Sequence, residues 1–404
     1  MTDNRNANHF GEPKKLNTII KHHLLSQTLQ TSLSIANNKC VAYKQNSNKT
    51  DNIYTYIDLF AGAGTFEDNS KGSPIIAYDI LSEHNNSLYN KFKKLQMACT
   101  EKHDESYQKL ESTISTYTTN NDIDCYIGQG SWESYKKNIE LLLENSGWGF
   151  IFADPFSTEL DIVALIETLK SYSNLKDILV FFNFNTLARQ DGRRCLQDID
   201  RICRTIGIDE KELLDDDSNF SVKFENKLIE HFKDLKKFVI GVGFPTTVKG
   251  DLINSDYFYL IFSTNTPVLV DTFLNAYEEM LDKYTNYSGM QQLALFGNPD
   301  KNYIYDVLKE NFAEGCSLFE LYLFITSKFL SWKELTKTQK KVPTIKNIVE
   351  ILNEFESDNS IRIIAEEKFL YKKTSKNGKA GNLKYTEAGN SAENMKNIKI
   401  VLNR

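Results

Sequence analysis

The stretch Tyr54-Thr55-Tyr56-Ile57-Asp58-Leu59-Phe60-Ala61-Gly62-Ala63-Gly64 decides the fold of this 404-residue chain. Residues 54–59 alternate aromatic and β-branched side chains, which is typical of a buried strand. Asp58 stands near the end of that strand, and the glycines after it let the backbone bend sharply and approach a ligand closely. Because doubly wound sheets bind ligands at the carboxyl ends of their strands, the stretch predicts a ligand site at the edge of an α/β sheet.

The spacing of the glycines indicates which ligand this is. A dinucleotide site has G-x-G-x-x-G at the start of a helix, but Gly64 is followed by no third glycine, which disfavours an NAD-dependent oxidoreductase. An acidic residue before the glycines suits a positively charged ligand, such as the methionine end of S-adenosylmethionine. Asp58, Phe60, Gly62 and Gly64 form D-x-F-x-G-x-G, which resembles motif I of Rossmann-like methyltransferases. The resemblance implies that these four residues hold that cofactor.

A second resemblance covers roughly residues 16–290. The segments 58–64, 67–68 and 72–77 resemble the three-Cys-motif partner family, methyltransferase-like proteins encoded beside a protein with a three-cysteine, radical-SAM-like motif. It implies a methyltransferase-like fold that works with this partner protein in DNA modification or defence against phage. The six cysteines of this chain have no zinc spacing, so we expect no metal site here.

The expected fold class is α/β, a Rossmann-like methyltransferase sheet that is mostly parallel with an antiparallel last strand. Apolar runs at 95–100, 123–127, 150–153, 178–184, 238–243 and 257–263 predict its further strands. Glu101 ends the second strand, where an acidic residue can accept both ribose hydroxyls; the alternative is a solvated loop charge. Gln129 lies in a glycine-containing turn after the third strand, and we expect this turn to contact the adenine.

The catalytic candidates Asp154, Pro155 and Phe156 follow the predicted fourth strand. Amino-methyltransferases have a related (D/N)-P-P-(Y/F) segment, whose polar side chain and a backbone carbonyl accept hydrogen bonds from an exocyclic amine. Its aromatic residue stacks on the base, a contact worth about 1–3 kcal/mol. This chain has one proline and not two, which leaves the acceptor open. The alternative is a proline-stiffened end of a strand.

The N-terminal part, residues 1–50, is expected to be an arm followed by an amphipathic helix over 14–36 and a polar loop over 37–52. Within this helix, Lys21 and His22 are candidates to reach across the cofactor site; the alternative is a cationic helix face. The methyltransferase domain is expected at 51–297.

A winged-helix-like domain is expected at 298–404, because three predicted helices precede a strand and a hairpin with Asn377-Gly378 at its tip. Residues 301–404 hold 18 Lys plus Arg against 13 Asp plus Glu, although the whole chain has a net charge of -6. A nucleic acid, DNA or RNA, is therefore the predicted partner of Lys372, Lys373, Lys376 and Lys379. The alternative is a winged helix that docks a protein.

Composition places the chain among globular proteins, with 41% hydrophobic and 25% charged residues. The sequence has no apolar run of the length that a bilayer span needs and no secretory signal at its start, so we expect no membrane contact and a cytoplasmic location. Two functions remain from the sequence. One is an S-adenosylmethionine-dependent methyltransferase, and the other is a catalytically inactive protein of the same fold that binds or regulates a partner.

Overall fold

The computed structural model describes residues 16–43, 52–118, 123–155, 160–172, 176–183, parts of 203–211, 220–248, 251–288, 301–328, 344–370, 382–384 and 392–403. The chain divides into two compact units, residues 1–263 and 264–404. The predicted domain boundary at 297–298 lies outside the described residues.

The first unit is built on a seven-stranded sheet with the strand order β3-β2-β1-β4-β5-β7-β6. Strands β1 to β5 pair in parallel, and β7 runs antiparallel to β5. This order, with its antiparallel strand near the end, is that of a Rossmann-like methyltransferase and confirms the predicted fold class. The strands are β1 (Ile53–Asp58), β2 (Lys94–Glu101), β3 (Ile123–Gln129), β4 (Trp148–Ala153), β5 (Lys176–Asn183), β6 (Phe238–Val248) and β7 (Asp251–Thr264).

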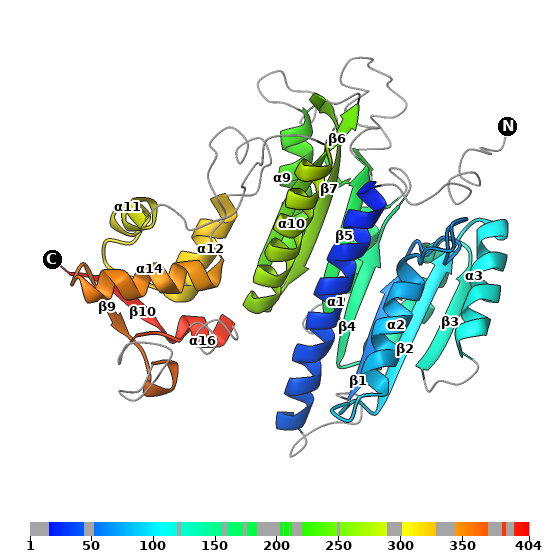
Figure 1. The fold of residues 1–404 in the computed structure, drawn as a ribbon, viewed down its shortest axis with the longest axis horizontal. Helices are drawn as coiled ribbons and strands as arrows, with labels where there is room; N and C mark the ends of the chain where they lie inside the picture. The colour runs from blue at the N-terminus through cyan, green and yellow to red at the C-terminus, as the bar shows by residue number, and fades with distance from the viewer. Residues whose placement is uncertain are drawn as a thin grey trace. The chain divides into compact units, whose positions relative to one another are not determined.

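Helices connect the successive parallel strands β1 to β5. Right-handed crossovers place α2 (Ser73–Asn85) and α3 (Asp104–Tyr117) on one face of the sheet, and α4 (Lys136–Glu144) and α5 (Ile162–Lys170) on the other. A 3-10 turn, η3 (Trp132–Tyr135), precedes α4, and α9 (Phe220–Lys233) packs against α5 and β6. Long α1 (Leu16–Tyr43) lies beside α2, in front of the sheet in Figure 1.

Helix α1 is longer than the sequence predicts. The prediction of a polar loop from residue 37 is wrong for 37–43, which continue the helix. Asn37 is buried, and its side chain donates to the Tyr89 carbonyl and accepts from the Lys91 N–H. Cys40 is also buried. A residue that looks polar in the sequence therefore has a packed, hydrogen-bonded place on the helix.

Aromatic side chains fill the core between the sheet and its helices. Tyr56 of β1 stacks on Phe150 of β4 at a centroid distance of 6.5 Å, and Phe152 meets Phe181 of β5 edge-on at 5.6 Å. All four are at most 1% exposed, so their burial contributes to the stability of the sheet. The alternation of aromatic residues in β1 thus marks a strand that is buried on both faces.

The second unit contains helices α10 (Pro267–Ser288), α11 (Lys301–Asn311), α12 (Leu318–Lys328) and α14 (Ile345–Ser357), with short α16 (Ala392–Lys396) and the 3-10 turn η5 (Glu367–Phe369). Its three-stranded sheet has the order β8-β10-β9, from β8 (Cys316–Ser317), β9 (Ile361–Ile364) and β10 (Lys399–Leu402). The three predicted helices and the strand after them are α11, α12, α14 and β9, and the winged-helix assignment stays a prediction. Leu370 and Leu383 bridge antiparallel at the base of the predicted hairpin, whose tip lies outside the described residues.

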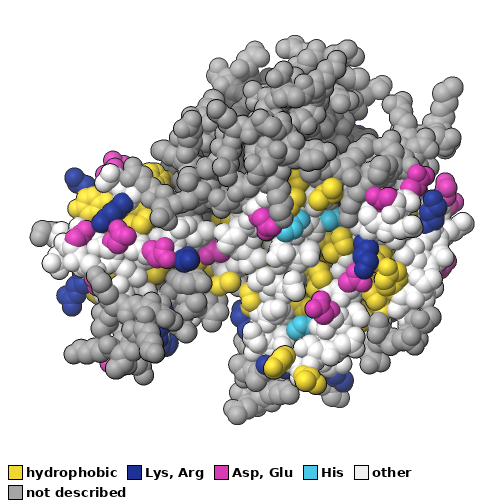
Figure 2. All heavy atoms as spheres, in the orientation of Figure 1, with side chains coloured by type: hydrophobic (Ala, Val, Ile, Leu, Met, Phe, Trp, Pro, Cys, Tyr) yellow, Lys and Arg dark blue, Asp and Glu magenta, His cyan; other side chains and the backbone are white. Residues whose placement is uncertain are grey.

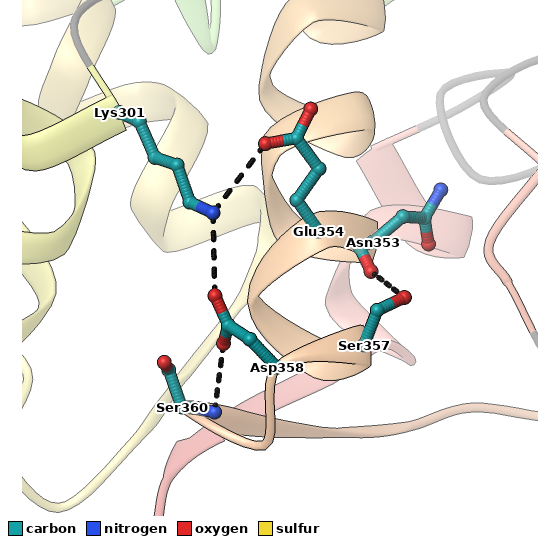
Figure 3. A network of polar contacts seen from close by, with 6 residues as sticks. All are labelled: Lys301, Asn353, Glu354, Ser357, Asp358 and Ser360. Atoms are coloured by element: carbon teal, nitrogen blue, oxygen red, sulfur yellow. Dashed lines mark hydrogen bonds and ion pairs between the residues drawn. The ribbon is translucent and has the colours of Figure 1, made fainter.

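Polar contacts fix both ends of α14. At its start Thr344 and Asn347 form a capping box. At its end Lys301 of α11 bridges Glu354 at 3.4 Å and Asp358 at 3.2 Å, as Figure 3 shows. Within the second unit, the acidic end of α14 is therefore tied to α11.

Among the described residues, the structure has no helix whose length and apolar character would let it cross a bilayer.

Candidate active site at the carboxyl edge of the sheet

Asp58 ends β1 and supports the loop that follows it. Its carboxylate accepts hydrogen bonds from the Phe60 N–H at 3.2 Å, from the Tyr56 hydroxyl at 3.1 Å and from the Ser73 hydroxyl. Burial raises the pKa of Asp58 to about 7, these three hydrogen bonds oppose the rise, and the charge of Asp154 adds to it. Because Asp58 is 0% exposed, its contacts within the protein fix the shape of the loop.

The glycines in the loop after β1 have a backbone geometry that side chains do not suit. Gly62 has φ +61° and Gly64 has φ +80°, conformations that L side chains rarely adopt. The Gly72 N–H donates to the Gly64 carbonyl at 2.7 Å, and a Cβ on Gly72 would lie 2.8 Å from that oxygen. Phe60 is half-buried. The turn at Gly62–Gly64 and the turn at Gly72 therefore lie against each other, and we call the backbone of these two turns the glycine cradle.

Glu101 joins the end of β2 to this cradle. Its two carboxylate oxygens accept hydrogen bonds from the N–H groups of Gly62 and His103, each at 2.8 Å. The side chain is 5% exposed, so the alternative of a solvated loop charge is wrong. Each carboxylate oxygen has a second lone pair, which leaves Glu101 able to accept further hydrogen bonds.

The turn after β3 lies next to Glu101. The Gly130 N–H donates to the Glu101 carbonyl at 2.8 Å, and the exposed side chain of Gln129 donates to Asp104 at 2.8 Å. Sequence analysis missed Tyr135, whose ring packs so closely on Gly128 that a Cβ there would lie 2.7 Å from it. The Tyr135 hydroxyl donates to the Gln129 carbonyl. Glycines at positions 128 and 130 permit such close packing, but they do not identify the ring that packs there.

Asp154 and Pro155 follow β4 at the same edge, beside the cradle. The Leu59 N–H donates to the Phe152 carbonyl at 3.0 Å, which fixes the exit of β4 against the exit of β1. Pro155 is buried, and Asp154 keeps about a quarter of its side-chain surface exposed. Phe156 lies outside the described residues.

Lys21 of α1 contacts Asp154 directly. Its Nζ lies 2.6 Å from Oδ1 and 2.8 Å from Oδ2, and 5.3 Å from the centre of the Phe181 ring. The start of α1 thus reaches the carboxyl ends of the strands, as Figure 1 shows. His22, the neighbouring residue, is buried and lies 6.0 Å from the Phe66 ring of the loop. Lys21 therefore belongs to the site, and the alternative of a cationic surface face does not describe it.

The predicted nucleic-acid-binding residues Lys372, Lys373, Lys376 and Lys379 lie outside the described residues. The described part of the second unit offers α14, whose exposed and half-exposed positions include Lys346 but also Glu350, Glu354 and Glu356. On the face drawn in Figure 2, basic and acidic side chains of the described residues are interspersed. Helix α14 therefore has the wrong charge to follow phosphates.

Comparison with known proteins shows no family for this chain. No family model matches the chain, and no curated protein matches it significantly, so membership of the three-Cys-motif partner family stays a prediction. Protein LPL1258 from Legionella pneumophila is 14% identical over 70% of this chain and 96% of its own, with a TM-score of 0.41.

Two methyltransferase structures are also similar. The O-methyltransferase from Bacillus cereus, solved in complex with SAH, is 15% identical over 59% of this chain and 90% of its own, with a TM-score of 0.27. A structure from Staphylococcus aureus, described provisionally as a caffeoyl-CoA O-methyltransferase, is 10% identical over 57% of this chain and 82% of its own. Its TM-score is also 0.27. Likeness at this level carries no argument about activity, and the fold class rests on the order of the strands.

Proposed function

We propose that this protein is an S-adenosylmethionine-dependent methyltransferase that acts on an exocyclic base amine of DNA or RNA in the cytoplasm. One observation supports this above the others. The ends of three adjacent parallel strands, β2, β1 and β4, bring Glu101, the Gly62–Gly64 cradle and Asp154 to one edge of the sheet. Ligands of open α/β sheets bind at this edge.

The residues at this edge fit S-adenosylmethionine. In this proposal the methionine end lies against the backbone of the glycine cradle, whose positive φ at Gly62 and Gly64 gives the loop a shape that L side chains rarely permit. In this proposal Glu101 accepts hydrogen bonds from the ribose, and the turn with Gln129 and Tyr135, which is bonded to the Glu101 carbonyl through the Gly130 N–H, contacts the adenine. When bound, the cofactor supplies a methyl group on a positively charged sulfur.

The acceptor side of the proposal rests on Asp154. Its carboxylate would accept a hydrogen bond from the amine, and Phe156 would stack on the base. The residues would then act mainly by holding the nitrogen in position, since orientation alone can supply several orders of magnitude in rate. Through the sequence resemblance, we extend the proposal to a three-Cys-motif partner protein, DNA modification and defence against phage.

A second candidate function is a methyltransferase fold that binds a partner and transfers no methyl group. It is favoured by the hydrogen bonds already present, since Asp58, Glu101 and Asp154 each have protein partners for their carboxylate oxygens. It is also compatible with the single proline after Asp154.

Calorimetric titration with S-adenosylmethionine and S-adenosylhomocysteine tests the cofactor site. We expect the wild type to bind with micromolar affinity and the Gly64→Val variant to lose this binding. The backbone at residue 64 has a φ that valine strains to adopt, and a Cβ there would lie only 3.1 Å from the Leu110 side chain. Gly315→Ala, in the second unit and also at a positive φ of +96°, is the matched control and should bind normally. No binding of either ligand by the wild type would favour the partner-protein function.

Transfer of a labelled methyl group to mixed DNA and RNA then separates the two candidate functions. Cofactor binding with transfer supports the enzyme. Cofactor binding without transfer, both alone and with a three-Cys-motif partner protein added, supports the second candidate function, a partner-binding protein.

A further inference from the structure

The pair formed by Lys21 and Asp154 is the contact that distinguishes this site from a bare carboxylate. Both carboxylate oxygens lie within 2.8 Å of the Lys21 ammonium. The two side chains are 12% and 23% exposed, so they are largely desolvated but remain in reach of a ligand. The centre of the Phe181 ring lies 5.3 Å from the Lys21 Nζ, at the distance of a cation–π contact. A strongly attractive pair in such surroundings keeps a fixed geometry.

The charge of this pair restricts which amines can approach Asp154. A free carboxylate attracts ammonium groups, such as a lysine side chain or a polyamine. With Lys21 already on the carboxylate, the pair is neutral overall, and a second cation would meet the repulsion of the first at close range. A neutral amine avoids that repulsion. The geometry therefore disfavours a protein lysine as the methyl acceptor.

The pair also offers two kinds of hydrogen bond side by side. Asp154 accepts through its remaining lone pairs, and the Lys21 ammonium is a donor with three N–H groups. An amine that docks on Asp154 would bring the ring atom beside it next to Lys21 Nζ. That ring atom could then replace or share one of the hydrogen bonds that Lys21 now donates to Asp154. The complementary ligand edge has an N–H donor beside a lone-pair acceptor. Adenine has this edge at its amine and N1, and cytosine has it at its amine and N3.

We propose that Lys21, paired with Asp154, is a specificity-determining residue that restricts the acceptor to a base whose exocyclic amine adjoins an unprotonated ring nitrogen on the Watson–Crick edge, namely adenine or cytosine. This inference rests on the proposed function. Lys21 donates to the ring nitrogen and Asp154 accepts from the amine, so the nitrogen lone pair is turned toward the methyl group. The methyl carbon then bonds to the amine nitrogen, its bond to sulfur breaks with both electrons staying on sulfur, and the amine proton passes to solvent.

The test uses short single-stranded oligonucleotides that each contain one acceptor base, with labelled S-adenosylmethionine as the methyl donor. One arm compares adenine with 1-deazaadenine, and the other compares cytosine with 3-deazacytosine. In each analogue a CH replaces the ring nitrogen that Lys21 is proposed to bind. 7-Deazaadenine, which loses a nitrogen on the other side of the base, and a lysine-rich peptide serve as controls.

We expect at least a tenfold loss of transfer with the ring-nitrogen analogue in the arm that is active, no loss with 7-deazaadenine and no transfer to the peptide. With the natural base, the Lys21→Met variant should transfer methyl groups about as slowly as the wild type does with the analogue. With the analogue, Lys21→Met should be little slower than the wild type, because the substitution and the analogue remove the same contact. Lys21→Arg, which keeps a donor and the charge, should retain more activity than Lys21→Met.

Equal transfer to the natural base and its analogue in the wild type would overturn the proposal, as would additive losses in Lys21→Met or methylation of the peptide. Binding of S-adenosylhomocysteine by calorimetry separates this failure from failure of the proposed function. Normal binding without transfer to any oligonucleotide overturns the proposed methyl transfer to a base, and this inference with it, and leaves the cofactor site standing. Absence of binding overturns the proposed function, and this inference with it.

Discussion

The Glu101 carboxylate accepts a hydrogen bond from the Gly62 backbone N–H at 2.8 Å, which links the end of β2 to the loop after β1. The other carboxylate oxygen binds the His103 N–H at the same distance. A buried acidic side chain that bridges two backbone segments stabilises the cradle before any ligand arrives. Its proposed contact with the ribose would add to this structural role.

Glu101→Gln tests both roles at once. The amide has only one accepting oxygen, so one of the two backbone N–H groups loses its partner, at a cost of about 1–3 kcal/mol in the free energy of unfolding. We expect the affinity for S-adenosylhomocysteine to fall at least tenfold. Urea denaturation and calorimetry measure the two effects. Unchanged affinity in a destabilised variant would show that Glu101 serves the loop alone.

Asp58 predicts a pH dependence of stability. Its pKa is raised from 3.8 to about 7 by burial, so the folded protein holds this proton more tightly than the unfolded chain. The stabilisation is fully present below about pH 4 and is lost as the pH rises through about 7. Asp58→Asn cannot ionise, so its free energy of unfolding relative to wild type should increase between pH 4 and 7. Urea denaturation across this range measures the difference.

The control for Asp58 is Asp306→Asn, an exposed change on α11 that should follow the wild-type pH profile. Parallel profiles of wild type and Asp58→Asn would contradict the raised pKa.

Asp154→Asn should separate binding from chemistry. Asparagine keeps an oxygen that accepts from an amine, but it loses the charge that holds Lys21. We expect cofactor affinity within about threefold of wild type and a drop in methyl transfer of roughly 10²-fold or more, typical of lost positioning. Asp154→Ala should be at least as inactive. An active Asp154→Ala variant would place the acceptor site elsewhere.

The four lysines of the predicted wing give a prediction about salt. If Lys372, Lys373, Lys376 and Lys379 contact phosphates of duplex DNA, each contributes about 0.9 to the slope of log affinity against log salt. Changing all four to glutamine should therefore reduce the slope by up to about 3.6. Fluorescence anisotropy with a labelled duplex between 50 and 300 mM salt measures it. An unchanged slope would favour the alternative of a protein-docking winged helix.

Thr344→Ala tests the capping box of α14. The Thr344 hydroxyl accepts from the Asn347 N–H at 3.2 Å, and removing a cap of this kind costs about 0.5–2 kcal/mol. We expect that loss in the unfolding of the second unit. Ser357→Ala, an exposed change at the other end of the same helix, should cost less than about 0.5 kcal/mol. Equal losses in the two variants would contradict the assignment of the cap.

Local patterns in the sequence were enough for the sheet. Strands such as β1 and β4 are buried on both faces, so their apolar runs are unbroken, and Asp58 and Asp154 follow directly at their ends. The extended ends of β6 and β7 were not predicted, because polar residues and Pro245 interrupt the pattern there. Pairing across the sheet stabilises such segments, and a sequence pattern does not show that pairing.

The candidate site was predictable in position but less so in its contacts. Motif spacing placed Gly62, Glu101 and Asp154 at one edge because parallel strands end together. The contact between Lys21 and Asp154 joins residues 133 apart, and nothing local in the sequence sets the rotation of α1 that brings them together. The packing of Tyr135 on Gly128 was likewise visible only once the turn had its backbone shape.

Helix α1 is fastened to the sheet at a second point, where Ser32 donates to Asp177 at 2.6 Å and accepts from the Tyr54 hydroxyl at 3.0 Å. Lys21 and Ser32 are eleven residues apart, about three full turns, so both point from the same side of the helix. The contacts of Ser32 in the core therefore fix the position and the rotation of the helix, and with them the place of Lys21. One residue inserted between them would turn Lys21 by about 100° and carry it away from Asp154, with every residue of the site still present.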